Sequence, residues 1–273
     1  MPNTEEAVLS RTEFPFDTTV AHPARVYNYW LGGKDNFEAD RVAGERALAG
    51  GAKILPGVRA NRAFLRRAVR FLAAEAGVRQ FLDIGTGLPS AGNTHEIAQE
   101  VAADSRVVYV DNDPIVLAHA RALLTSQTGT TAYIDADARD TGRILREAAG
   151  TLDFGQPVAV LFLMILQYIP DEDHPGRIVR EILDALPAGS YLAHSDTALD
   201  ISADANVATS AAGLNKRMPT NQHLRTPEQL ATYYTGLELV EPGQVQLPKW
   251  RPAPDDPDPS LILSAYCGVA RKP

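Results

Sequence analysis

The stretch FLDIGTGLPSAGN, residues 81–93, combines residue types that can bind a nucleotide. Hydrophobic residues lead to Asp83, and a turn of Gly85, Thr86 and Gly87 follows. Glycines let the backbone approach a ligand closely and adopt positive φ angles. A carboxylate here would repel a pyrophosphate, but it suits a ligand that carries an ammonium group. The turn predicts either a cofactor with a cationic tail or a plain connection between a strand and a helix.

Further acids end the next two expected strands. Asp111, followed by Asn112, ends the second, and a carboxylate there can accept hydrogen bonds from both hydroxyls of a ribose or else cap the following helix. The third ends in DADARD, where Asp137 could accept from the exocyclic amine of adenine and the Ala138 N–H could donate to a ring nitrogen. Three acids after successive strands favour an adenosine cofactor with a positive charge over a dinucleotide.

Strand and helix patterns alternate from residue 79 onward. The strand-like segments are RQFLDIG, RVVYVDND, TAYIDADARD, PVAVLFLMIL and SYLAHSD, and helical segments separate them. PVAVLFLMIL is continuously apolar, which is typical of a central strand covered on both faces. This order predicts an α/β protein with a parallel, doubly wound sheet that binds its ligand at the carboxyl ends of the strands.

Helical patterns flank this alternation on both sides. HPARVYNYWLGG, NFEADRVAGERALAG and VRANRAFLRRAVRFLAAEAG predict three helices before the sheet, and much of 197–236 has a helical pattern. LELVEPGQVQLP and LILSAYCGVARK predict an antiparallel hairpin at one sheet edge. With no repeat or linker, we expect a single domain over 1–273. It divides into an N-terminal helical arm or lid (1–78), a cofactor-binding core (79–196), and acceptor-side helices with the C-terminal hairpin (197–273).

These motifs, taken in order, resemble the class I S-adenosylmethionine-dependent methyltransferases, and within them an actinobacterial family without an assigned substrate. The resembling segments are ARVYNYWLGGKDNFEADR, NRAFLRRAVRFLA, FLDIGTGLPSAGNTHE, VVYVDNDPIVLAHARALL, DADARD and LMILQYIPDEDHPGRIVREI. They run from about residue 20 to 195, and weaker similarity continues to the C-terminus. The resemblance implies a Rossmann-like, mostly parallel seven-stranded sheet with an antiparallel last strand. It also implies S-adenosylmethionine as cofactor and S-adenosylhomocysteine as product.

The resemblance carries over to individual positions. Asp83, Gly85 and Gly87 match the first cofactor motif, Asp111 matches the ribose-binding acid, and Asp137 with Ala138 matches the adenine-side motif. The sequence departs from many class I enzymes in its longer glycine turn, where Gly92 and Asn93 are expected to replace a prompt third glycine. Which backbone amides contact the cofactor stays open.

Other cofactor contacts are expected outside these motifs. Leu163 and Met164 follow the central strand and could form an apolar wall against the cofactor. Arg62 either pairs with the cofactor carboxylate or belongs to a solvated arginine face. Tyr29 and Gly33 lie in VYNYWLGGKDNF, which either closes over the cofactor as a lid or packs its aromatic residues on the sheet.

The catalytic residues stay undefined, because methyl transfer from a sulfonium needs mainly proximity and alignment. Tyr29, Tyr168 and His194 are candidates by position alone for a base or a polar contact. The six histidines lack the spacing of a metal site, so no metal is expected.

The composition of the chain limits the classes of partner that we expect. The 273-residue chain has a formal net charge of −8, which disfavours a nucleic-acid partner, and we expect a small-molecule acceptor. Its single cysteine excludes an internal disulfide, and the start MPNTEEAVLS lacks the features of a secretory signal. No apolar stretch is long enough to span a membrane, so a cytoplasmic protein is expected. The oligomeric state stays open.

Two alternatives remain. One is a regulatory protein that binds S-adenosylmethionine or S-adenosylhomocysteine without turnover, since a fold and a pocket do not prove catalysis. The other is an NAD-dependent oxidoreductase, which is disfavoured because Leu88 and Pro89 stand where a pyrophosphate would approach a helix N-terminus.

Overall fold

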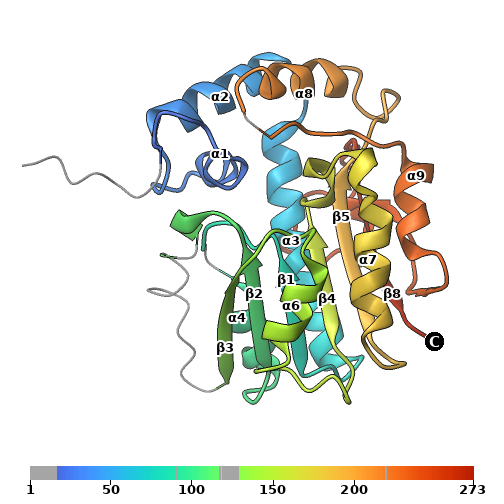
Figure 1. Ribbon diagram of the computed structural model, residues 1–273. Coiled ribbons are helices and arrows are strands. Elements are labelled where there is room, and N and C mark those ends of the chain that lie inside the picture. Colours follow the sequence, from blue (N-terminus) through green and yellow to red (C-terminus); the bar gives the residue numbers. More distant parts are fainter. Residues whose placement is uncertain (1–16, 90–91, 117, 119–128, 219) are drawn as a thin grey trace, which may run out of the picture.

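A mixed eight-stranded sheet forms the centre of the protein, in a computed structural model that describes residues 17–89, 92–116, 118, 129–218 and 220–273 (Figure 1). Its strand order is β3-β2-β1-β4-β5-β8-β6, and β7 also pairs with β8. The strands are β1 (Gln80–Ile84), β2 (Arg106–Asp111), β3 (Thr130–Asp135), β4 (Ala159–Leu163), β5 (Tyr191–Thr197), β6 (Glu238–Leu239), β7 (Val245–Gln246) and β8 (Ala265–Arg271).

The first five strands are parallel, and the register brings their carboxyl ends to one edge. Asp111 at the end of β2 pairs with Asp135 at the end of β3. The doubly wound sheet expected from the sequence is thus confirmed.

The C-terminal part adds antiparallel strands. β8 runs antiparallel to β5, as expected for the last strand, and β6 and β7 pair with β8. The sheet has eight strands rather than seven because LELVEPGQVQLP forms two short strands. Pro242 has no N–H for a strand ladder, and Gly243 has a φ of 86°, so the segment breaks between β6 and β7.

Helices cover both faces of the sheet (Figure 1). α6, α7 and α9 lie on one face, while α3 and α4 lie on the other. The helices are α1 (Pro23–Trp30), α2 (Glu38–Ala49), α3 (Ile54–Ala74), α4 (Thr94–Val101), α6 (Thr141–Ala148), α7 (Pro175–Asp184), α8 (Val207–Asn215) and α9 (Pro227–Ala231), and the 3₁₀ turns are η1 (Leu166–Tyr168), η2 (Asp171–Asp173), η3 (Thr232–Tyr234) and η4 (Leu247–Lys249). Residues 114–116 and 118 of the helix expected after β2 are helical, and 117 and 119–125 lie outside the described residues.

β4 shows why the central strands are continuously apolar. Val160 and Phe162 pack in the cluster under α6 and α7, whereas Ala159 and Leu161 pack in the cluster under α3. Successive side chains of a strand point to opposite faces, so a strand covered on both faces buries every residue.

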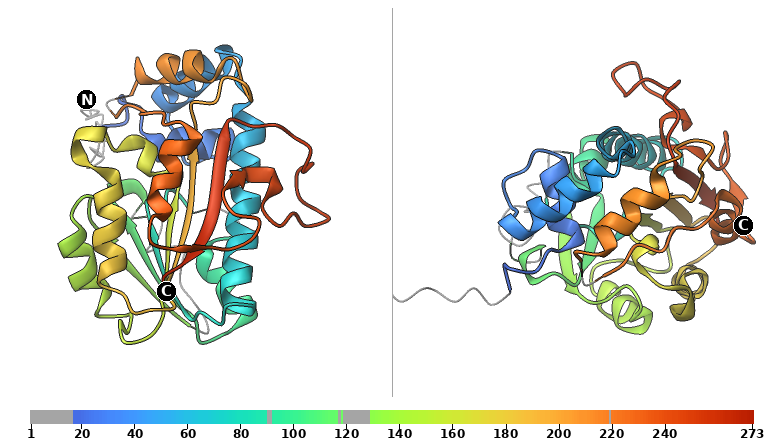
Figure 2. Two further views of the ribbon diagram at one scale, coloured as in Figure 1. Left: turned by 90° about the vertical axis from the view of Figure 1, so that its right-hand side faces the viewer. Right: turned by 90° about the horizontal axis from the view of Figure 1, so that it is seen from above.

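A helical cap covers the carboxyl end of the sheet. It consists of α1, α2 and α8, and Figure 2, right, shows the blue and orange helices side by side over this end. Val26, Ala43, Ala47 and Leu214 are buried together where the three helices meet. The cap therefore joins the N-terminal helices to a helix from the C-terminal third of the chain.

The segment 197–236 is less helical than its pattern indicates. Asp200 accepts hydrogen bonds from the N–H groups of Ser202 and Ala203, and Asp204 accepts one from Asn206. Such local side-chain bonds compete with helix formation, so the helix begins only at Val207.

Candidate functional site

A cavity of about 300 Å³ lies between the carboxyl end of the sheet and the cap. Twelve of the expected site residues line it: Arg62, Asp83, Gly85, Thr86, Gly87, Asp111, Asn112, Asp137, Ala138, Leu163, Met164 and Tyr168. Ligands of doubly wound folds bind at this edge, and the volume is at the lower end for a small-molecule site. The structure thus brings together the acids, glycines and apolar wall residues that the sequence singles out.

Asp83 is a buried carboxylate at the end of β1. It accepts a 2.6 Å hydrogen bond from the hydroxyl of Thr94, the first residue of α4. The pKa of Asp83 is raised to about 6: burial is the main cause, the Thr94 bond and the charge of Arg62 oppose it, and the charge of Asp111 adds to it. A cation bound beside Asp83 would stabilise its charged form.

Asp111 organises the turn that follows β1. Its carboxylate accepts hydrogen bonds from the N–H of Gly87 at 2.8 Å and from the N–H of Asp113 at 2.9 Å. Burial raises its pKa, and these two bonds oppose the rise. The remaining lone pairs can accept from hydroxyl groups of a ligand.

The two glycines of the turn have different roles. Gly85 has a φ of 74°, and a Cβ atom there would lie 2.5 Å from a side-chain atom of Ile165. Gly87 has a φ of 67°, and a Cβ there would meet no atom within 4 Å. Gly85 therefore permits close packing of two loops, while Gly87 leaves open space in the cavity wall.

Asp137 is held by a neighbouring arginine. Arg139 donates from its Nε and a terminal nitrogen to the two carboxylate oxygens, at 2.8 and 2.7 Å, and it also pairs with Asp173 at 2.8 Å. The bonds from Arg139 keep the pKa of Asp137 low. Asp137 is thus charged and oriented, with lone pairs left for a donor such as an amino group.

Arg62 extends from α3 to the same end of the cavity. It donates a 2.8 Å hydrogen bond to the carbonyl of Gly92, and its charge lowers the pKa of Asp83. A guanidinium beside a carboxylate suits a zwitterionic group, because each ionic end meets its opposite.

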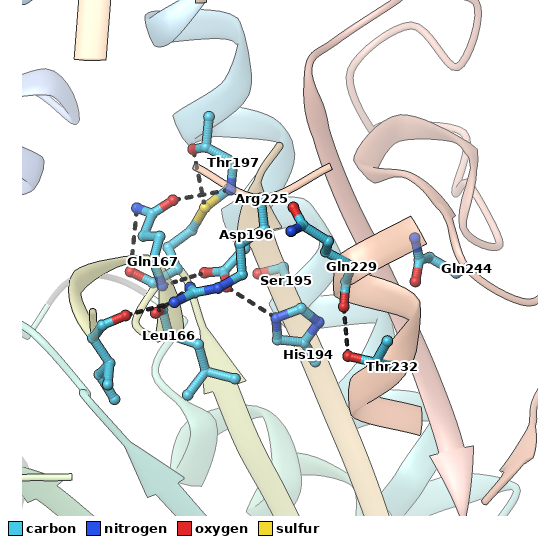
Figure 3. A network of polar contacts seen from close by, with 12 residues as sticks. Leu166, Gln167, His194, Ser195, Asp196, Thr197, Arg225, Gln229, Thr232 and Gln244 are labelled. Carbon is cyan, nitrogen blue, oxygen red and sulfur yellow. Dashed lines mark hydrogen bonds and ion pairs between the residues drawn. The ribbon is translucent and has the colours of Figure 1, made fainter. Parts of the chain in front are cut away.

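The wall formed by Leu163 and Met164 is fixed by contacts with β5. Met164 has a φ of 59°, and its N–H donates to the Ser195 carbonyl at 2.7 Å. Gln167 lies between the two strand ends: its N–H donates to Asp196, and its side-chain oxygen accepts from the Thr197 N–H at 2.9 Å (Figure 3). The wall is therefore held in place by backbone and side-chain bonds to β5 rather than being a free loop.

Arg225 fixes the next part of this wall. Its guanidinium donates to the carbonyls of Leu166 and Ile169, at 2.9 and 2.7 Å, and pairs with Asp171 at 2.7 Å (Figure 3 labels Leu166 and Arg225). Only 6% of the Arg225 side chain is exposed, against 77% for Asp171. The two bonds to the carbonyl groups are therefore buried, whereas the ion pair involves a largely exposed carboxylate.

Four expected site residues do not line the cavity. Tyr29 donates its hydroxyl to Glu45 on α2, and Gly33 closes the turn after α1 by donating its N–H to the Asn28 carbonyl. Asn93 caps α4, and its N–H donates to Glu96. His194 is buried between Asp196 and Tyr234, at 3.1 and 3.2 Å. We remove these four from the proposed site, because their geometry serves α1, α2, α4 and the core.

Sequence reasoning missed residues that join the cap to the sheet. His22 lies 2.9 Å from the Asp113 carboxylate, beside Asp111. Asn61 accepts from the Ser195 hydroxyl at 2.7 Å and donates to the Tyr27 hydroxyl at 3.0 Å. No local pattern reveals such pairs, because the partners are separated by up to 134 residues.

Two other features bear on the class of site. Within the described residues, no three His, Cys, Asp or Glu side chains lie together as a metal site would require. Across the same residues, no helix combines the length and apolar character needed to cross a bilayer.

Comparison with known proteins identifies the family. The model of a family described as S-adenosyl methyltransferase matches residues 10–273. The crystal structure of a DUF574 family protein from Streptomyces avermitilis is 45% identical, with a TM-score of 0.88 over 94% of this chain and 99% of that chain. A putative methyltransferase from Thermobifida fusca is 39% identical, with a TM-score of 0.83 over 94% and 96%.

Solved structures of lower sequence identity share only the fold with this chain. A methyltransferase structure from Anabaena variabilis is 14% identical and has a TM-score of 0.53, over 79% of this chain and 86% of that chain. The search of curated proteins returned no match. The matched family model, together with the doubly wound sheet and its antiparallel last strand, shows that the chain belongs to the S-adenosyl methyltransferase family and has the Rossmann-like class I fold.

Proposed function

We propose that this protein transfers the methyl group of S-adenosylmethionine to a small-molecule acceptor bound in the cavity under the cap. Membership of the methyltransferase family supports the reaction type. The observation that carries the cofactor assignment is the pair of buried carboxylates, Asp83 and Asp111, both with a raised pKa. Buried carboxylates favour a ligand that brings positive charge and hydrogen-bond donors.

The lining residues fit such a ligand part by part. Asp111 would accept from the ribose hydroxyls, and Asp83 with Arg62 would hold the ammonium and carboxylate groups of the amino-acid end. On the adenine side, contacts would come from Asn112, Asp137 and Ala138. The apolar wall would come from Leu163 and Met164, and Gly85, Thr86 and Gly87 provide the close backbone approach. We further propose that α1 acts as a lid, held over the cavity by the contact of His22 with Asp113.

When bound, the cofactor supplies a methyl group that is already activated by its sulfonium sulfur. The protein must then position the two reactants and exclude water, and correct positioning is worth about 7–11 kcal/mol. The rigid wall after β4 and the packed cap provide this positioning. We assign no general base, since His194 is enclosed in the core.

The acceptor is proposed to be small because the cap covers the cavity, and a nucleic-acid acceptor is disfavoured by the net charge of −8. The expected cytoplasmic location is part of the same proposal. The comparisons give no support to NAD-dependent oxidation or to a regulator without turnover.

Calorimetry with the purified protein tests this function first. We expect S-adenosylmethionine and S-adenosylhomocysteine to bind one per chain, and NAD to produce no heat. Incubation with methyl-labelled cofactor and a metabolite extract should then produce a labelled small molecule. Binding of NAD instead of the adenosyl ligands would overturn the proposal. Adenosyl binding with no labelled product from any extract would favour the regulatory alternative.

A further inference from the structure

The cavity extends beyond its acidic half into a second region with different chemistry. We call the region around Arg62, Asp83, Asp111 and Asp137 the acidic half. The cap half is lined by α1, the start of α3, α8, Thr220, Gln222, and the ends of β4, β5 and β8. Apolar side chains of this half are Leu31, Ile54, Val207, Ala211, Leu214 and Leu263. Because β4, β5 and β8 lie on the other side of β1 from β2 and β3, the two halves follow each other along the sheet edge.

The charged side chains of the cap half are already engaged. Among its described lining residues, these are Lys53 and Asp204. The Lys53 ammonium donates to the carbonyl of Ile262 at 3.0 Å. Asp204 accepts from the N–H groups of Lys53 and Asn206, at 2.8 and 3.0 Å. One positive and one negative side chain, both oriented by backbone bonds, give this half no excess of either charge, so the desolvation of an ionic acceptor would be poorly compensated.

Several neutral polar groups of this half are also committed to the fold. Asn61 bridges Ser195 and Tyr27, and the Tyr27 hydroxyl donates to the Val58 carbonyl at 3.3 Å. The Ser210 hydroxyl accepts from the Ala52 N–H at 3.1 Å. These bonds attach α1, α3 and α8 to one another and to the sheet, so they define the walls rather than supply charge to a ligand.

Tyr168 and Gln222 are two neutral polar residues of the cap half, on the side of the cavity next to β4. We call this pair the polar point. Both line the cavity, and the side chains of Gln167 and Gln222 are close enough to the Tyr168 hydroxyl to lower its pKa, against the larger effect of burial. Burial raises the pKa of Tyr168, so its hydroxyl stays neutral at physiological pH. A phenol and an amide can both donate and accept, which suits an uncharged hydroxyl, carbonyl or amine on a ligand.

We infer that the cap half receives an uncharged, mainly apolar acceptor whose polar group is oriented by Tyr168 and Gln222, an inference that rests on the function proposed above. The observations that carry it are the apolar lining from the cap, the two charges bound to backbone groups, and the neutral pair at the β4 side. Charge in this cavity is concentrated in the acidic half, beside the proposed cofactor.

The test uses three probes of one shape that differ in charge: 2-naphthylmethanol, 2-naphthoate and 2-naphthylmethylammonium. The protein is first titrated with S-adenosylhomocysteine, and absence of binding at this step is a failure of the proposed function. Each probe is then titrated into the saturated protein. We expect the neutral probe to bind at least about tenfold more tightly than either ion, because an ion loses its hydration without gaining a partner. Equal or tighter binding of an ionic probe, or no binding of the neutral one, would overturn the inference.

Gln222→Glu sharpens this test, because it adds a negative charge at the polar point without changing the size of the side chain. We expect it to weaken the neutral probe and to tighten the cationic probe at least about fivefold, with S-adenosylhomocysteine affinity changed less than about twofold. Gln156→Glu is the matched control, since Gln156 is exposed just before β4 at the opposite end of the strand. An unchanged preference in Gln222→Glu would remove Gln222 from the acceptor site and overturn its assigned role.

Discussion

The acidic half and the cap half of the cavity differ in charge and in how the sequence builds them. The acidic half takes its carboxylates from the ends of three neighbouring strands, and each follows a clear strand pattern. The cap half is built from contacts between distant segments, such as Asn61 with Ser195 and Lys53 with Asp204. Its polar groups mostly bond to the protein, whereas Asp83 and Asp111 have raised pKa values that a cationic ligand would relieve. One half is thus suited to a charged cofactor and the other to a neutral partner.

The largest effect is expected from Asp111→Asn in the acidic half. Asparagine keeps one acceptor oxygen and replaces the other with a donor, so it cannot accept from both ribose hydroxyls and from Gly87 as the carboxylate does. We expect S-adenosylhomocysteine affinity to fall at least about 100-fold, or about 2.7 kcal/mol, as measured by calorimetry.

Asp135→Asn provides the matched control for this substitution. Asp135 is exposed, ends the neighbouring strand and pairs in register with Asp111, but it does not line the cavity. The Asp135→Asn variant should bind S-adenosylhomocysteine as tightly as the unsubstituted protein does. Similar losses in both variants would show that strand ends in general, and not the ribose contact, determine affinity.

The next effect concerns pH and Asp83. Burial raises its pKa from 3.8 to about 6, so the ligand ammonium meets a carboxylate above pH 6 and a neutral acid below it. S-adenosylhomocysteine affinity should fall about tenfold for each pH unit below 6. Asp83→Asn should bind more weakly at neutral pH and show a flatter pH profile, and any remaining slope would come from Asp111, whose pKa is also raised.

The stability of the ligand-free protein should change in the opposite direction. A carboxyl group with a raised pKa in the folded state stabilises the fold fully below pH 3.8, and this contribution is lost as the pH rises through about 6. Between pH 3.8 and about 6, the thermal midpoint of the ligand-free protein should therefore lose the part that Asp83 contributes. Over the same pH range, the rise in thermal midpoint caused by S-adenosylhomocysteine should grow. A ligand-induced shift of equal size at pH 5 and pH 7 would contradict the role of Asp83.

The sequence predicted the acidic half well because its signals are local. An acid at the end of an apolar strand and a glycine turn directly after it occupy a few consecutive residues, and parallel strands bring their ends to one edge. Asp83, Asp111 and Asp137 therefore meet in one cavity as expected. The alternation of strands and helices could be predicted for the same reason, because strands and helices differ in the period of their hydrophobic residues.

Most side chains that line the cap half could not be predicted in this way, although Tyr168 was a candidate. Tyr29 and His194 were chosen by position, yet neither lines the cavity, because Tyr29 bonds to Glu45 on α2 and His194 to Asp196 and Tyr234 in the core. Whether a side chain of a helix such as α1 or a strand such as β5 faces the cavity depends on how that element packs against its tertiary neighbours. The bond from the Lys53 ammonium to the Ile262 carbonyl likewise joins residues more than 200 positions apart, so no local pattern reveals it.

A smaller effect is expected where the cap half meets the sheet, at Arg225. Arg225→Lys keeps the charge but cannot reproduce the donors that contact Leu166, Ile169 and Asp171 together. We expect the free energy of unfolding in urea to fall by about 1 kcal/mol. S-adenosylhomocysteine affinity should change less than about twofold, since the acidic half is intact.

Asp171→Asn separates the two kinds of bond that Arg225 makes. It removes only the ion pair to a largely exposed carboxylate, so we expect a loss below about 0.5 kcal/mol. A larger loss from Asp171→Asn than from Arg225→Lys would show that the ion pair, rather than the carbonyl bonds, holds the wall after β4.

The smallest effect is expected from Tyr29→Phe, and its contrast with Tyr168→Phe tests the division of the cavity. Tyr29 loses a bond to Glu45 outside the cavity, so both S-adenosylhomocysteine and 2-naphthylmethanol should bind within about twofold of the original affinity. Tyr168→Phe removes a hydroxyl from the cap half, so it should weaken only the naphthyl probe, by about three- to tenfold. If Tyr29→Phe weakened either ligand as much, the turn after α1 would have to close over the cavity in the bound state, and the boundary of the cap half would move toward α2.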